Sequence, residues 1–123
     1  MEFFKEVKIH KINTKHLKKL LTIKTLPELC QSIDTVILDN HNNGQIYCLW
    51  GEFSINREEL KDGVRFSLPN CPNALAWTIT LDADIDTILI HCTINKRVHD
   101  KDFVESIEQF IIDWSHGIEL HLH

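Results

Sequence analysis

The sequence is poor in the residues that interrupt regular structure, with three prolines and four glycines among 123 residues. No linker, internal repeat or low-complexity stretch divides it, so we expect a single domain over residues 1–123. Its hydrophobic and charged fractions, 43% and 25%, are close to globular averages, which argues against disorder away from the ends.

Long hydrophobic runs and targeting signals are also missing. The longest apolar runs are far too short to span a bilayer, and near the N-terminus Phe3 and Phe4 are followed at once by Lys5 and Glu6. No CxxC pair occurs, so the standard zinc and redox motifs are absent. The four cysteines are Cys30, Cys48, Cys71 and Cys92. We therefore expect a reduced, soluble, cytoplasmic protein with no membrane partner.

The chain also lacks the broad positive charge that nucleic-acid binding requires, since its net charge is -5 with neutral histidines. Basic residues do gather near the front, at Lys5, Lys8, Lys11, Lys15, Lys18, Lys19 and Lys24. We interpret them as the solvated face of a strand and a helix, with an anionic partner as the minor alternative. No nucleic-acid partner is expected.

Catalytic and metal-binding signatures are missing as well. There is no GxGxxG, P-loop, GxSxG, HExxH or HxxxH motif. The eight histidines are scattered. His121 and His123 would share one face of a strand, His91 lies on a predicted strand, and His99 and His116 flank the last predicted helix. A zinc site needs three or four ligands at one point, so we expect no metal and no cofactor.

The first third of the chain mixes strand and helix signals. Residues 3–12 predict an edge strand, and Thr14 stands where an N-cap would precede a helix bearing Leu17, Leu20 and Leu21. Pro27 suits the first turn of a second short helix, and residues 35–38 form a short apolar strand.

Residues 45–94 then follow a strand period. Alternation predicts strands within residues 45–55, 64–68, 75–81 and 88–94. Turns at residues 39–44, 69–73 and 82–84 and a polar connection at residues 56–63 separate these segments from each other and from the strand before them. Such short connections favour antiparallel pairing.

The last predicted helix has the clearest signal. An apolar stripe at i, i+4, i+7, i+8 and i+11 comprises Phe103, Ile107, Phe110, Ile111 and Trp114. Asp100 or Asp102 can cap the helix, Asp102 and Glu105 fit the spacing of a capping box, and Gly117 stands where a left-handed C-terminal cap would be. The tail, residues 118–123, alternates again, as in a short added strand or a partly artificial tail.

These elements predict an α+β fold: an antiparallel sheet of about four to six strands, short N-terminal helices, and a C-terminal amphipathic helix packed on one face. The apolar face would carry Leu49, Phe53, Val64, Phe66, Trp77, Ile79, Ile88, Ile90 and Ile94. The polar face would carry Trp50, Glu52, Ser54, Arg65, Ser67, Thr78, Thr80, His91 and Thr93. A sheet with one face in water gives this pattern without any function.

Trp50 is the exception on that face, because a large aromatic among polar groups is a common anchor for a ligand or partner. The favoured hypothesis is a binding or accessory protein that holds a protein partner, or a second copy in a homodimer, through the polar face or a sheet edge.

The alternative is a small enzyme or small-molecule-binding protein with a pocket around four residues. There Glu52 would supply an acid, Arg65 an anion clamp and His91 a base, beside Trp50. Whether the chain is an enzyme stays open. Cys71 lies in a tight turn between Asn70 and Pro72, where we interpret it as a structural or incidental thiol; a nucleophilic role would need a nearby base.

Overall fold

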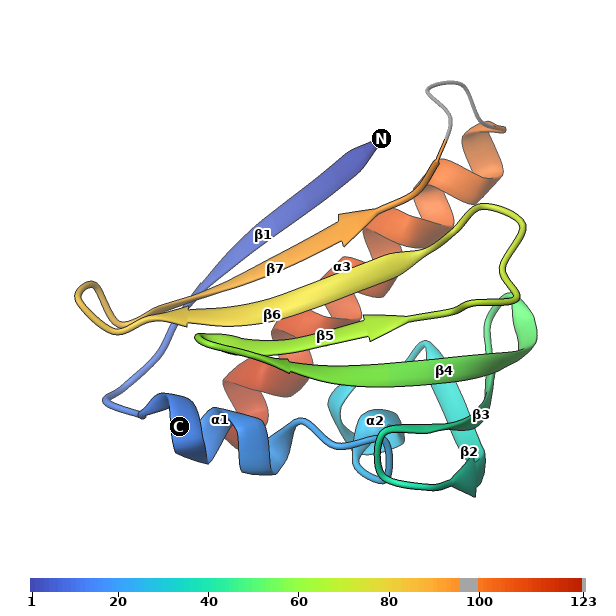
Figure 1. The fold of residues 1–123 in the computed structure, drawn as a ribbon. Helices are drawn as coiled ribbons and strands as arrows, with labels where there is room; N and C mark the ends of the chain where they lie inside the picture. The colour runs from blue at the N-terminus through green and yellow to red at the C-terminus, as the bar shows by residue number, and fades with distance from the viewer. Residues whose placement is uncertain (96–99, 123) are drawn as a thin grey trace.

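The computed structural model describes residues 1–95 and 100–122, and within them it has seven strands and three helices (Figure 1). The strands are β1 (Glu2–Lys8), β2 (Ile33–Asp39), β3 (Asn43–Cys48), β4 (Gly51–Leu60), β5 (Gly63–Ser67), β6 (Ala76–Asp82) and β7 (Thr87–Thr93). The helices are α1 (Thr14–Leu20), α2 (Leu26–Leu29) and α3 (Lys101–His121). His99 and His123 lie outside the described residues.

The strands form one antiparallel sheet in the order β1-β7-β6-β5-β4-β3-β2. Helix α3 crosses one face of this sheet, while α1 and α2 lie in the connection from β1 to β2 (Figure 1). The predicted α+β class, antiparallel sheet and covering C-terminal helix are confirmed. The predicted strand number is wrong, because the sheet has seven strands rather than four to six.

The error in strand number arises at residues 45–55, which form a hairpin rather than one strand. Cys48 pairs with Gly51 across a two-residue turn, and Gly51 has a φ of 120° that other residues rarely adopt. The alternation restarts at this turn. Leu49, predicted on the apolar face, is therefore 45% exposed in the turn.

The predicted polar connection at residues 56–63 is also wrong, because β4 continues to Leu60. Arg57 explains why so polar a segment is a strand. Its side chain points to the covered side of the sheet, where Nε and Nη2 donate to the carbonyl oxygens of Leu21 (2.6 Å) and Lys18 (3.0 Å) at the end of α1. A charged donor thus satisfies carbonyls that the end of a helix leaves unpaired.

Four aromatic rings fill the space between the sheet and α3. Phe66 and Trp77 come from the sheet, Phe110 and Trp114 come from the helix, and none is more than 1% exposed. Five ring contacts among them have centroid distances between 4.9 and 6.5 Å. The predicted helix stripe is confirmed, with Phe103 at its margin only partly buried.

Both ends of α3 differ from the prediction. The N-cap is Asp100, whose side chain makes no capping hydrogen bond, so the capping box of Asp102 and Glu105 does not form. At the other end the helix continues through Gly117 to His121, because Ile118 and Leu122 are buried. The predicted cap at Gly117 and the predicted strand after it are therefore wrong.

Helix α1 begins one residue earlier than predicted. Asn13 is the N-cap, and its Oδ1 accepts a hydrogen bond of 2.8 Å from the backbone N–H of His16. Asn and Thr are both good capping residues, and either fits the sequence. None of the helices in residues 1–95 and 100–122 is both long and apolar enough to cross a membrane.

Candidate functional site

The face of the sheet away from α3, here called the outer face, carries a row of cross-strand neighbours. The strand registers pair Phe4 with His91, His91 with Thr78, Thr78 with Arg65, and Arg65 with Glu58. Directly paired residues point to the same side of a sheet. The row therefore runs over five strands, from β1 to β4, and includes two of the predicted site residues, Arg65 and His91.

The two residues are held by different partners. The ring of His91 stacks on Phe4 with centroids 4.3 Å apart, and its Nε2 lies 3.0 Å from Oε1 of Glu2. The guanidinium of Arg65 lies 2.9 Å from a carboxylate oxygen of Glu58. Because Thr78 separates them, Arg65 and His91 lie about 10 Å apart. Neither closes on a shared centre.

The predicted placement of Trp50 on this face is wrong. Trp50 lies in the turn between β3 and β4, and its indole packs against α3, with ring centroids 5.0 Å from Phe110 and 6.2 Å from Phe103. Its Nε1 donates a hydrogen bond of 2.8 Å to Oγ of Ser106. The two-residue turn interrupts the alternation from which the placement was inferred. Trp50 anchors the turn to the helix.

Glu52 is on the outer face but at the far end of β4. It pairs with Tyr47 of β3 and is exposed. Six residues of strand, about 20 Å, separate it from Glu58 in the row. The four predicted residues thus do not converge on one pocket, and the geometry gives no support to an acid, an anion clamp and a base acting together.

The cysteines do not form a reactive centre in the described residues. All four are free thiols, of which Cys30, Cys48 and Cys92 are buried. Burial raises the pKa of Cys92 to about 12 and also raises the pKa of Cys30 and of Cys48. Cys71 is half-buried, and no histidine or carboxylate in the described part of the chain is hydrogen-bonded to it.

The histidines likewise gather no metal site within residues 1–95 and 100–122, where no three His, Cys, Asp or Glu side chains could hold an ion together. His121 lies 3.2 Å from the carbonyl oxygen of Glu28 at the end of α2, and His116 is exposed on α3.

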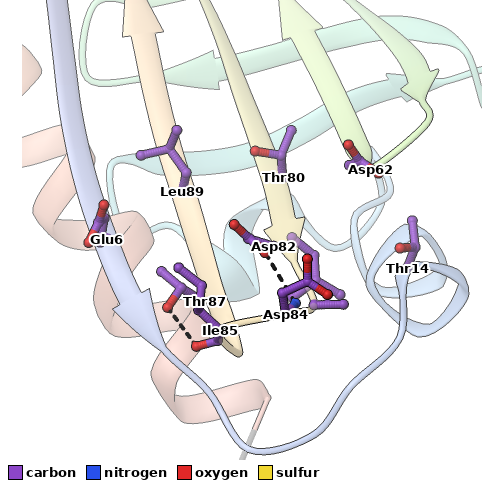
Figure 2. Close-up of a pocket in the computed structure, with 11 residues that line it drawn as sticks. Glu6, Thr14, Asp62, Thr80, Asp82, Asp84, Ile85, Thr87 and Leu89 are labelled. Carbon is purple, nitrogen blue, oxygen red and sulfur yellow. Dashed lines mark hydrogen bonds between the residues drawn. The ribbon is translucent and has the colours of Figure 1, made fainter.

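A hollow opens on the outer face at the β6–β7 turn, with a volume of about 610 Å³ (Figure 2). Its carboxylates are those of Glu6, Asp62, Asp82 and Asp84. Thr80 and Leu89 line the part that lies on the sheet (Figure 2). The side chain of Asp82 accepts a hydrogen bond from the backbone N–H of Asp84, which shapes the turn itself. The arrangement favours cations over anions by its charge alone.

The free edge of β1 is the other distinct feature. Met1 and Ile94 exchange both backbone hydrogen bonds at 3.0 Å, and Ile9 donates to Asp86 at 3.0 Å. Because β1 and β7 pair without a register shift, Phe3, Lys5 and Val7 direct their backbone groups toward β7. The backbone groups that face away from the sheet are those of Glu2, Phe4, Glu6 and Lys8.

An apolar hollow of about 410 Å³ lies beside this edge. It is formed where β1 meets α3, and its residues are Phe3, Phe4, Lys5, Glu108, Ile111 and Ile112. Phe4 is 58% exposed and Ile112 is 37% exposed. An unpaired strand next to apolar side chains is the arrangement that accepts a further strand. Sequence reasoning identified an edge strand here but not the hollow, because the hollow needs Ile111 and Ile112 from a distant helix.

The opposite edge, β2, is built differently. Its register with β3 shifts twice, between Ile33 and Thr35 and between Val36 and Leu38. Its sequence carries Asp34 near one end and Asp39 at the other. Bulges and charges are two ways in which proteins protect an edge from unwanted pairing. Only β1, of the two edges, is a regular strand.

Two polar atoms in the aromatic core lack partners. Trp77 Nε1 and Trp114 Nε1 are buried, and neither has a hydrogen-bond acceptor among the described residues. Their ring centroids are 6.3 Å apart. Leaving a buried donor unpaired costs about 1–3 kcal/mol, so these two donors are where an acceptor entering the interior would bind.

Comparison with known proteins shows the fold. Three solved structures match most of the chain: the protein XoxI from Bacillus cereus (TM-score 0.67, 14% identity, 99% of this chain and 94% of that one), an uncharacterized protein from Bacillus thuringiensis (0.62, 15%, 95% and 96%), and a START superfamily protein from Mycobacterium smegmatis (0.62, 10%, 99% and 95%). No family model and no curated protein matches. At such low identity the likeness concerns the arrangement of sheet and helix alone.

Proposed function

We propose that this chain is a binding protein that takes an additional β-strand onto the free edge of β1. The observation that carries the proposal is the seven-residue edge of β1, which pairs with β7 without a shift and points the backbone groups of Glu2, Phe4, Glu6 and Lys8 outward. Main-chain hydrogen bonds give such an edge its affinity, and the neighbouring hollow gives a place for side chains. The fold neighbours are consistent with a binding or accessory role.

A peptide with the sequence of residues 1–9 of this chain is a suitable probe, because it alternates as β1 does. Titration into the isotopically labelled full chain should shift and protect the amides of Phe4, Glu6 and Lys8, while those of Phe3, Lys5 and Val7 are already bonded to β7.

The matched variants are Glu6→Pro and Glu6→Ala. Proline removes the outward N–H of residue 6 without touching a bond to β7 and is tolerated on a free edge, whereas alanine keeps that N–H. We expect Glu6→Pro to lose peptide binding and Glu6→Ala to retain it. Equal binding by both variants, or peptide shifts confined to another surface, would refute strand addition at β1.

A second candidate function is supported by the two unpaired indole donors. A small, largely apolar molecule with one carbonyl or hydroxyl oxygen would satisfy Trp77 Nε1 or Trp114 Nε1 between the sheet and α3. A thermal-shift screen of such molecules tests it. Binding in the interior should raise the melting temperature of the wild type and be weakened in Trp114→Phe, which keeps most of the ring but removes the donor; hits that bind both proteins equally would contradict it.

A further inference from the structure

We infer that the strand added to β1 is β1 of a second copy, paired antiparallel about a two-fold axis with Lys5 at its centre, so that Glu2 of each copy lies opposite Lys8 of the other. The inference rests on the proposed strand addition and names its partner. It is drawn from the order of side chains along β1, Glu-Phe-Phe-Lys-Glu-Val-Lys.

Geometry first limits the registers to three. Residues directly opposite each other must point to the same side of a sheet, so outer-face residues of one copy must meet outer-face residues of the other. Glu2, Phe4, Glu6 and Lys8 are on the outer face, since Phe4 pairs with His91 and Val7 is buried toward α3. The two-fold axis can therefore pass through Phe4, Lys5 or Glu6.

Charge then selects one of the three. With the axis at Phe4, Glu2 meets Glu6 of the second copy, and with the axis at Glu6, the two Glu6 side chains meet each other; both place like charges directly opposite. With the axis at Lys5, Glu2 meets Lys8 twice, and the whole of β1 is paired. The apolar side chains follow, because Phe3 then lies opposite Val7.

The backbone agrees with this register. The outward N–H and C=O groups belong to Glu2, Phe4, Glu6 and Lys8, so Glu2 exchanges hydrogen bonds with Lys8 and Phe4 exchanges them with Glu6. Lys5 sits at the axis as a pair without mutual hydrogen bonds, on the side of α3.

One like-charge pair remains, because Lys5 of each copy lies beside Lys5 of the other. Each Lys5 shares its hollow with Glu108 of α3, so two carboxylates accompany the two ammonium groups at the axis. Ile112, 37% exposed beside β1, would be covered by the approaching copy. On the outer face, Glu2 also contacts His91 at 3.0 Å, and its two oxygens leave room for a lysine partner.

The test measures the mass of the full chain by light scattering and sedimentation over a wide range of concentration. The wild type should form a dimer. Glu2→Lys and Lys8→Glu should each weaken it about tenfold, since each turns both end pairs from attractive to repulsive. The double variant, Glu2→Lys with Lys8→Glu, should restore the dimer, because the charges are exchanged but remain opposite.

Charge-matched controls are Glu52→Lys and Lys61→Glu, which make the same changes of net charge on exposed residues away from β1; both should leave the dimer intact. Circular dichroism checks that every variant is folded. His91→Gln separates loss of the His91 contact from loss of the pair with Lys8, and should dimerise like the wild type.

The possible failures are distinguishable. A wild type that is monomeric at all concentrations overturns the second copy as the partner, while peptide binding at β1 would still uphold strand addition. A dimer unchanged by Glu2→Lys and Lys8→Glu, or not restored in the double variant, overturns the register. A dimer that also survives Glu6→Pro contradicts strand addition itself.

Discussion

Gly117 lies inside α3, where alanine is normally the better residue by about 1 kcal/mol. Here we expect Gly117→Ala to destabilise the protein. A Cβ at this position would lie 1.8 Å from the carbonyl oxygen of Leu29 and 2.5 Å from its carbonyl carbon. Both are backbone atoms, so no side-chain rotation relieves the clash, and α2 must move away from α3.

The magnitude follows from two opposed effects. Overpacking a close contact costs about 1–3 kcal/mol, and the helix preference of alanine returns about 1 kcal/mol. Displacement of α2 also disturbs Leu26, Leu29 and Cys30, all of which are buried, which places the overpacking cost at its upper end. We expect a net loss of about 1–2 kcal/mol, or roughly 3–5 °C in melting temperature for each kcal/mol.

Urea unfolding followed by tryptophan fluorescence measures this change, because Trp77 and Trp114 are buried. Glu119→Ala is the control, since it alters an exposed residue two positions along the same helix. A Gly117→Ala variant as stable as the wild type, or more stable, would refute the argument and would mean that α2 and α3 are farther apart in solution.

Three further changes test other contacts. Arg57→Met should cost about 2–4 kcal/mol in urea unfolding, because two backbone carbonyls at the end of α1 lose a charged donor, whereas Arg65→Met, which breaks an exposed pair with Glu58, should cost less than about 1 kcal/mol; equal losses would contradict the role of Arg57. In the folded protein at pH 8, one thiol, Cys71, should react quickly with an aromatic disulfide reagent and three more only after unfolding; rapid release from the wild type that persists in Cys71→Ser would disprove this. Because burial raises the pKa of Cys92 from 9.0 to about 12, the unfolded chain loses this proton first, so the free energy of unfolding should be unaffected by this thiol below pH 9 and fall by up to about 1.4 kcal/mol per pH unit between pH 9 and 12; Cys92→Ala should show a shallower fall, and an unchanged slope would count against the buried thiol.

The elements that were predicted well are those whose own side chains repeat at the period of the structure. The stripe through Ile107, Phe110 and Trp114 repeats along a helix, and its burial depends only on the presence of an apolar surface opposite. The alternation around Phe66 and Trp77 identifies two strands in the same way. Neither depends on a particular distant residue.

The junctions were predicted less well, because their sequences resemble other structures. Leu49 and Trp50 form the turn between β3 and β4 but are not typical turn residues, and the glycine that permits the turn, Gly51, follows them. Gly117 sits near a plausible helix end, and the sequence does not distinguish a cap from a close contact. Only the approach of Leu29 does so.

The candidate site shows the same division. Alternation correctly placed Arg65 and His91 on the outer face, since each lies within an uninterrupted strand. It placed Trp50 wrongly because the hairpin turn restarts the alternation. The edge of β1 required the strand order, which depends on pairing between Glu2 and Thr93, residues far apart in the sequence that carry no signal of their contact.

The packing of the interior limits where function can reside. Phe66, Trp77, Phe110 and Trp114 occupy the space between the sheet and α3, so a ligand there must displace or rearrange aromatic side chains, and the two unpaired indole donors are the reason to test for one. The surface asks for no rearrangement. The two sheet edges differ in regularity, and an edge protected by bulges and carboxylates beside β2 contrasts with a regular, charge-alternating edge at β1. An exposed regular edge favours unwanted pairing unless it has a partner, and the sequence of β1 matches its own reverse better than it avoids it.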